Sequence, residues 1–161
     1  MARMLFDTNV VLDVLLNRPP WAAEAIRLWR ANEAGAIVGY VTASSLTDIF
    51  YVACRIGGRD TAHRAVRVCL DAFEICPVDR RALEQAAALP GNDFEDNLQM
   101  VCASQMALDA IVTRDVQGFN SSPVPVLTPA EAIARFGLSL PADDPGAATT
   151  PLPRQGTTAG E

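Results

Sequence analysis

The sequence predicts an α/β fold in which helices cover both faces of a parallel sheet. Short apolar segments alternate with longer amphipathic segments through most of the 161 residues, which is the pattern of strands joined by helical crossovers. Half of the residues are hydrophobic, enough for one substantial core. We therefore expect one domain over residues 1–138. From Ser139 onward Pro, Ala, Gly and Thr dominate, so residues 139–161 are expected to form a disordered tail.

The first half of the chain predicts two strands and four helices. An apolar strand at residues 4–6 ends on Asp7, and a short helix over residues 10–16 follows it. An amphipathic helix is expected over residues 21–33, with Gly35 just past its end. A second strand at residues 37–41 leads into Thr42-Ala43-Ser44-Ser45, whose hydroxyls suit a helix cap. That helix should run over residues 44–55 and break at Gly57-Gly58, before another over residues 60–70.

The second half predicts three more strands. A strand at residues 73–78 precedes a helix over residues 80–89, which Pro90-Gly91 stops. A long apolar helix over residues 93–108 leads into a strand at residues 110–113. The last strand lies at residues 124–127, where Pro125 indicates an edge position. Thr128-Pro129 begins the final helix, with proline at its favoured first position.

Missing residue types exclude several functions. The chain has no lysine, which excludes Schiff-base chemistry, P-loop NTPases, kinases and a receiver domain. A haloacid-dehalogenase-like phosphatase needs a second aspartate where this chain has Asn9. The one histidine, His63, is interpreted as a solvated helix residue. Four scattered cysteines indicate reduced thiols rather than zinc ligands. With no signal region and no apolar run long enough to span a membrane, a cytoplasmic protein is expected.

Several aspartates are predicted to meet at one edge of the sheet, where parallel strands end. Asp7 ends the first strand, and Asp115 follows the fourth. Asp48 lies early in the helix after the second strand, on the same face as Ser44 and Ser45, of which Ser44 is expected to be a supporting residue. Asp93 and Asp96 share a face at a helix start, which favours anions. Taken alone, Asp93 could be merely a cap and Asp48 a solvated residue, and Asp13 and Asp109 are interpreted as ordinary surface acids.

Clustered carboxylates predict a site for a hard divalent cation. They repel one another unless positive charge lies among them, and oxygen-only ligands suit Mg²⁺ or Mn²⁺. Bound cations also invert the local sign of charge, so the net charge of −6 does not exclude nucleic acid. One or two such ions would support hydrolysis of a nucleic-acid backbone with metal-activated water as the nucleophile.

These motifs, taken in order, resemble the PIN domain. The segments that carry the resemblance are Asp7-Thr8-Asn9-Val10-Val11-Leu12-Asp13, Ser45-Leu46-Thr47-Asp48, Asp93-Phe94-Glu95-Asp96-Asn97-Leu98-Gln99, Ile111-Val112-Thr113-Arg114-Asp115, Phe119 and Pro125-Val126-Leu127-Thr128-Pro129. The likeness covers residues 1–137 and is greatest for the toxin-component branch similar to the VapC ribonucleases. It implies a three-layer α/β/α fold with a five-stranded parallel sheet in the order 3-2-1-4-5. It also implies Mg²⁺- or Mn²⁺-dependent cleavage of RNA, a homodimer and inhibition by a cognate antitoxin.

The resemblance also assigns roles by position. The metal-site and catalytic acids would be Asp7, Asp48, Asp96 and Asp115, with Asp93 as an auxiliary metal ligand and with Thr8, Asn9 and Thr113 as supporting residues. Three departures are that Asp48 is shorter than the usual glutamate, that Gly118 thins the rim of the site, and that Asn97 replaces alanine. Apart from the resemblance, candidate phosphate contacts are Arg18, Arg55, Arg59 and Arg114. A solvated surface position is the alternative for each of them, and Arg114, beside Asp115, is favoured for RNA. The alternative is a catalytically weak or inactive PIN fold that binds RNA or protein.

Overall fold

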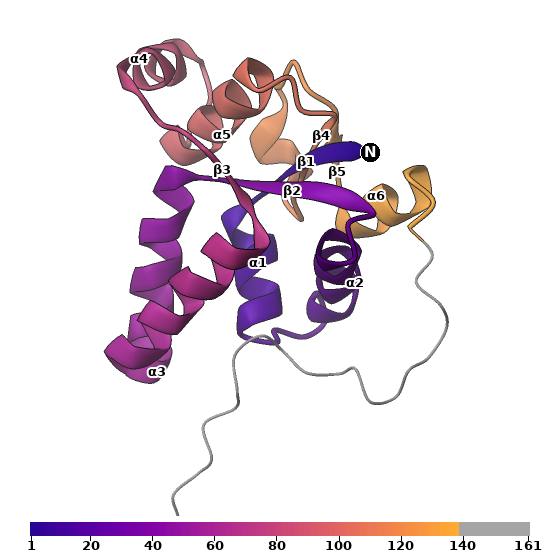
Figure 1. Cartoon of the computed structure of the whole chain (residues 1–161). Helices are drawn as coiled ribbons and strands as arrows, with labels where there is room; N and C mark the ends of the chain where they lie inside the picture. The colour runs from indigo at the N-terminus through magenta and orange to yellow at the C-terminus, as the bar shows by residue number, and fades with distance from the viewer. Residues whose placement is uncertain (139–161) are drawn as a thin grey trace, which may run out of the picture.

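The computed structural model describes residues 1–138, and the predicted tail at residues 139–161 lies outside the described residues. Helices and strands alternate along the described chain as expected (Figure 1). In order the elements are β1 (Ala2–Phe6), α1 (Thr8–Leu15), α2 (Ala22–Glu33), β2 (Ile37–Thr42), α3 (Ala43–Ala72), β3 (Glu74–Cys76), α4 (Arg80–Ala88), α5 (Phe94–Gln105), β4 (Ala110–Val112), the short 3-10 helix η1 (Val116–Phe119), β5 (Val126–Leu127) and α6 (Pro129–Arg135).

The five strands form one parallel sheet in the order β3-β2-β1-β4-β5. Helices α1, α2 and α3 lie on one side of the sheet and α4 and α5 on the other (Figure 1). This confirms the three-layer α/β/α fold and the strand order. Because β1 pairs with both β2 and β4, the carboxyl end of β1 lies at the middle of the edge where ligands bind in open α/β sheets.

Successive side chains of the central strands point to opposite faces of the sheet, so the hydrophobic core has two parts. Met4 and Phe6 of β1 pack with α1, α2, α3 and α6, whereas Leu5 packs with α4 and α5. Successive side chains of a strand point to opposite faces, so β1 contributes to both cores. On the first face, Phe73 packs against Phe6 and edge-on against Trp29, with ring centroids 5.1 and 4.8 Å apart.

Glycines mark two predicted helix boundaries. The long α3 is two helical segments joined at Gly58, whose φ of 78° lies in the left-handed region, so the predicted break is confirmed. Such a φ strongly favours glycine. Gly35, with φ of 71°, follows the last residues of α2 and donates its N–H to the Asn32 carbonyl. It is the expected left-handed residue just past a helix end.

Asn97 has a structural role that the sequence left unassigned. Its side chain is buried, and Nδ2 donates to the carbonyls of Ala86, Leu89 and Gly91 at 3.2–3.4 Å. The Ala86 carbonyl lies in the last turn of α4, and the Leu89 and Gly91 carbonyls lie in the loop between α4 and α5. Asn97 therefore fixes the loop from which the acidic start of α5 emerges.

Other expectations concern the edge strand and the surface. Strand β5 lies at the edge of the sheet, as Pro125 indicated, and the Pro125 carbonyl accepts from Ile111 N at 2.8 Å. His63 is exposed, and all four cysteines are free. Within residues 1–138, no helix has both the length and the apolar character needed to cross a membrane.

Candidate active site

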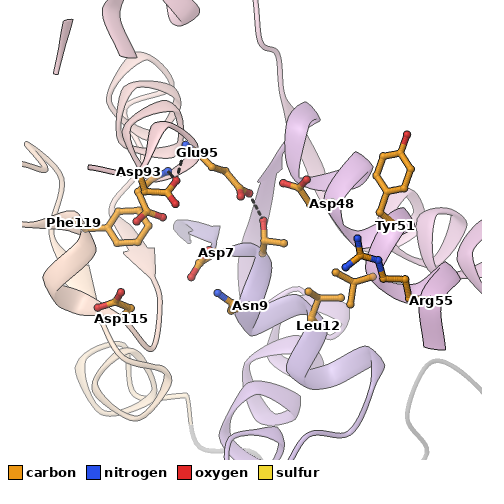
Figure 2. Close-up of a pocket in the computed structure, with 13 residues that line it drawn as sticks. Asp7, Asn9, Leu12, Asp48, Tyr51, Arg55, Asp93, Glu95, Asp115 and Phe119 are labelled. Atoms are coloured by element: carbon orange, nitrogen blue, oxygen red, sulfur yellow. Dashed lines mark hydrogen bonds between the residues drawn. The ribbon is translucent and has the colours of Figure 1, made fainter. Parts of the chain in front are cut away.

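A cavity of about 560 Å³ lies at the carboxyl ends of β1, β2 and β4, and six of its thirteen lining residues are acids (Figure 2). All five aspartates that the sequence placed at this edge line it: Asp7, Asp48, Asp93, Asp96 and Asp115. So does Glu95, for which no role in the site was predicted. The other lining residues are Thr8, Asn9, Leu12, Tyr51, Val52, Arg55 and Phe119.

Asp7 is a buried carboxylate held from two sides. Its backbone N–H donates to Val112 O at 2.9 Å, which continues the hydrogen bonding between β1 and β4 by one residue and fixes the backbone of Asp7. Gln99 Nε2 donates to Oδ1 at 3.1 Å, and Thr113 Oγ1 donates to Oδ2 at 2.9 Å. Although Asp7 lies at the N-cap of α1, its side chain makes no capping hydrogen bond. Burial raises the pKa of Asp7 despite these donors, as expected where desolvation disfavours charge.

The start of α5 brings a second group of acids toward Asp7. Asp93 is the N-cap, and its Oδ1 accepts from the backbone N–H groups of Glu95 and Asp96 at 2.8 and 3.2 Å. Asp93 is thus a helix cap that also lines the cavity. Asp96 is half-buried, and burial followed by the charges of Asp93, Asp7 and Asp115 raises its pKa to about 6. Four carboxylates from three segments therefore repel one another here.

Glu95 and Gln99 join the two sides of the site, and sequence reasoning gave neither of them a role. Thr8 Oγ1 donates to Glu95 Oε1 at 2.6 Å, and Gln99 Nε2 lies 3.4 Å from the same oxygen. Burial, followed by the charges of Asp48 and Asp7, raises the pKa of Glu95 to about 7. One signal was available: Glu95 and Gln99 are four residues apart and share a helix face, and Gln99 interrupts an apolar run.

Asp48 lies across the cavity from α5, on α3. Figure 2 shows its carboxylate directed toward Glu95, whose pKa its charge helps to raise. At the start of the same helix, Ser45 is buried 2.9 Å from Thr8 Oγ1, whereas the Ser44 hydroxyl lies 2.9 Å from that of Thr42. The hydroxyl that contacts the site network is therefore that of Ser45.

Asp115 is positioned by the turn that follows β4. Thr113 Oγ1, which donates to Asp7, also accepts from Asp115 N at 3.0 Å. Asp115 then caps η1 by accepting from Gly118 N at 3.3 Å. A Cβ at Gly118 would lie 2.7 Å from Asp96 Oδ2 and 3.3 Å from Asp115 Oδ2. Gly118 therefore leaves both carboxylates uncovered on this side.

The interpretation of Asp13 as a surface acid is wrong. Its side chain is 1% exposed and forms ion pairs with Arg18 Nε at 2.8 Å and with Arg114 Nε at 3.2 Å. Arg114 also stacks over Trp21, with its guanidinium carbon 3.9 Å from the ring centroid. Arg18 donates to the backbone carbonyl of Asn9 at 3.1 Å. The sequence could not reveal this cluster because its members come together only when the β4 turn packs beside α1.

The observed contacts of Arg114 are structural, since its Nε pairs with Asp13 and its plane covers Trp21. Its predicted role in RNA binding stays a prediction. The exposed Asn9 is brought to the cavity wall, as a supporting residue would be.

The chemistry of the donor set fits a hard divalent cation. Within residues 1–138, no three His, Cys, Asp or Glu side chains converge tightly enough to enclose a metal ion by themselves. Mg²⁺ does not need such a cage, because it commonly keeps several waters and binds one or two carboxylates together with substrate phosphates. The raised pKa values of Asp7, Asp96 and Glu95 indicate a site that lacks compensating positive charge. A cation would supply that charge.

Comparisons with known proteins agree with this arrangement. The model of the PIN domain family matches residues 3–117. Similar solved structures include a toxin–antitoxin complex from Klebsiella pneumoniae (23% identity, 78% of this chain and 97% of that chain, TM-score 0.58) and DNA-bound VapBC from Salmonella typhimurium (17%, 80% and 99%, 0.60). A third is a sarcin–ricin loop-cleaving VapC toxin from Mycobacterium tuberculosis (15%, 67% and 86%, 0.56).

At these identities the solved structures share the fold with this chain. Among curated proteins, none matches the sequence. The family model covers well over half of the 161 residues, and the resemblance drawn from the motifs is confirmed. The chain belongs to the PIN domain family.

Proposed function

We propose that this chain is a metal-dependent endoribonuclease that hydrolyses RNA phosphodiester bonds, and that it is the toxin of a toxin–antitoxin pair. The observation that carries the proposal is the cavity at the strand ends, where carboxylates from β1, α3, α5 and the β4 turn lie together and where burial raises the pKa of Asp7 and Asp96. Family membership and the similarity in fold to solved toxin–antitoxin proteins support it.

The residues that would hold Mg²⁺ or Mn²⁺ are Asp7, Asp48, Asp96 and Asp115, with Asp93 as an auxiliary ligand, and all five line the cavity. When bound there, a divalent cation stabilises charge on phosphate oxygens and activates water. Gln99 and Thr113 hold the Asp7 carboxylate in one orientation, and Thr8 holds Glu95. Such positioning lowers the cost of assembling the reacting groups.

The proposal extends to partners and setting. A cognate antitoxin would inhibit the enzyme, and a homodimer is the expected assembly, as the resemblance implies. A cytoplasmic setting suits four cysteines that are all free, because thiols stay reduced there.

Cleavage of a fluorescently labelled single-stranded RNA, together with calorimetric titration of Mn²⁺, tests the proposal. Wild-type protein should bind Mn²⁺ and cut RNA only when the ion is present. Asp7→Asn and Asp96→Asn should lose both properties, whereas Asp71→Asn, an exposed acid on α3 outside the cavity, should keep both. Cleavage that survives Asp7→Asn and Asp96→Asn would show that the catalytic assignment is wrong.

The absence of a closed three-acid cage within residues 1–138 favours one alternative, a PIN fold that binds RNA or protein with little or no catalysis. The same experiment separates the two. A binding module would retain RNA in a gel-shift assay and release no product at any Mn²⁺ concentration.

A further inference from the structure

Three arginines lie at or beside the acidic cavity, and they differ in whether their charge is already paired. Arg18 and Arg114 both form ion pairs with the buried Asp13. Arg55 is exposed and lines the cavity, and within residues 1–138 no hydrogen bond or ion pair engages its side chain. It is the one basic residue among those lining the cavity of the described chain. Arg55 therefore offers an unpaired positive charge to a phosphate that enters this acidic site.

Arg55 belongs to a stripe that begins at the site itself. Asp48, Tyr51, Val52 and Arg55 all line the cavity, and their spacings of three, four and seven residues place them on one face of α3. Arg55 lies two turns from Asp48, about 10 Å along the helix axis. Figure 2 shows Tyr51 and Arg55 on the α3 side of the cavity, across from Asp115 and Phe119.

Tyr51 provides an exposed aromatic surface beside that arginine. Its side chain is 65% exposed, and Phe50 packs against it edge-on with ring centroids 5.8 Å apart and planes at 87°. Aromatic rings on which unpaired bases stack, next to basic groups that follow the backbone, are the usual means of binding single-stranded nucleic acid. An exposed ring that is steadied by a neighbour, beside an unpaired guanidinium, matches that requirement.

A second cavity continues the path on the far side of the acids. It measures about 540 Å³ and shares Asp93, Asp96 and Asp115 with the first, while Asn92, Gln117 and Asn120 add polar amides to its wall. Gly118 lies where the two cavities meet, and any side chain there would press on Asp96 and Asp115. An extended strand can therefore lie in both cavities with the acids beneath its middle.

From this arrangement we propose that the Tyr51–Arg55 stripe of α3 is the binding arm for single-stranded RNA. Arg55 contacts a phosphate next to the one that is cut, through the two-pronged geometry that guanidinium groups form with phosphate oxygens. Tyr51 stacks on an adjacent base. This inference rests on the proposed function and assigns the substrate's position within that site.

Fluorescence anisotropy with a short labelled single-stranded RNA tests the binding arm, using Ca²⁺ in place of Mn²⁺ to slow turnover, and cleavage with Mn²⁺ is measured in parallel. Arg55→Gln should weaken RNA affinity and reduce the slope of log affinity against log salt by about 0.7, the value for one lost phosphate contact on a single strand. Tyr51→Ala should weaken affinity by about 10-fold or more, and Tyr51→Phe should restore it, because stacking needs the ring and not the hydroxyl. Neither Arg55→Gln nor Tyr51→Ala should change Mn²⁺ affinity in the absence of RNA.

Arg59→Gln is the matched control. Arg59 is exposed on the same helix but follows the kink at Gly58 and does not line the cavity, so affinity and salt slope should stay as in the wild type. If wild-type protein binds and cuts RNA and both Arg55→Gln and Tyr51→Ala bind it equally well, the binding arm is wrong and the stripe is free for a protein partner. If wild-type protein neither binds nor cuts RNA, the proposed function itself fails.

Discussion

Replacing Asp96 with asparagine should stabilise the metal-free protein at neutral and alkaline pH while it removes metal binding. The pKa of Asp96 is raised from 3.8 to about 6 by burial and by the charges of Asp93, Asp7 and Asp115. The folded state therefore holds this proton more tightly than the unfolded chain does. Stability falls as pH rises through the range between these two values, and the full cost is present above about pH 6.

The magnitude follows from the same change in pKa. A rise from 3.8 to about 6 corresponds to at most about 3 kcal/mol of unfolding free energy. Because Asp96 is only half-buried, solvent screening reduces this to about 1 kcal/mol. Asparagine has nearly the same shape and no charge, and within residues 1–138 no hydrogen bond to the Asp96 carboxylate would be lost. For a domain of this size the gain should raise the melting temperature by about 3 °C.

Thermal denaturation in EDTA at about pH 8 and about pH 5 measures the effect, because linkage makes the gain full at the first pH and about half as large at the second. Asp71→Asn controls for the loss of an exposed negative charge. With saturating Mn²⁺ the wild type should become more stable than Asp96→Asn, since a ligand that binds only the folded wild type stabilises it alone. An Asp96→Asn variant that is less stable than the wild type in EDTA at both pH values would refute this reasoning.

Three further substitutions test other parts of the structure. Asp13→Ala should lower the free energy of unfolding in urea by about 2–3 kcal/mol, because it leaves two partly buried arginines without their partner. The control Glu84→Ala breaks an exposed pair with Arg80 and should lower the free energy of unfolding by under about 0.5 kcal/mol. Equal losses in the two variants would contradict the burial argument. Asn97→Asp keeps the side-chain size but cannot donate to the carbonyls that end α4, so it should cost about 2 kcal/mol in the same assay, and a neutral result would show that these bonds are dispensable. Gly118→Ala should melt close to the wild type yet bind Mn²⁺ more weakly by calorimetry, because its Cβ would displace the Asp96 carboxylate; unchanged affinity would place the ion elsewhere.

Local patterns were sufficient to predict the fold class but not the strand order. The alternation of apolar strands and amphipathic helices indicated the parallel sheet, Pro125 indicated the edge strand, and Gly58 marked the break in α3. Each of these signals depends on a few neighbouring residues and on backbone sterics. The strand order came from the resemblance, since no local pattern specifies which strands pair.

The candidate site was predicted in part for the same reason. Asp7, Asp96 and Asp115 follow strand ends or begin a helix, so topology alone brings them together. Asp13 could not be assigned, because its partners Arg18 and Arg114 meet it only in the folded chain. Glu95 was overlooked because an acid in the first turn of a helix is ordinary, and its importance arises from contacts with Thr8 and Gln99.

The chemical form of the cut RNA ends tests the central claim most directly, because the claim is hydrolysis by activated water within a site that includes Asp7. Mass spectrometry of products formed with Mn²⁺ should show only linear phosphate and hydroxyl ends, and Asp7→Asn should form none. Ends bearing a 2′,3′-cyclic phosphate would show attack by the RNA's own 2′-hydroxyl, and their presence in wild-type and Asp7→Asn reactions alike would contradict the account.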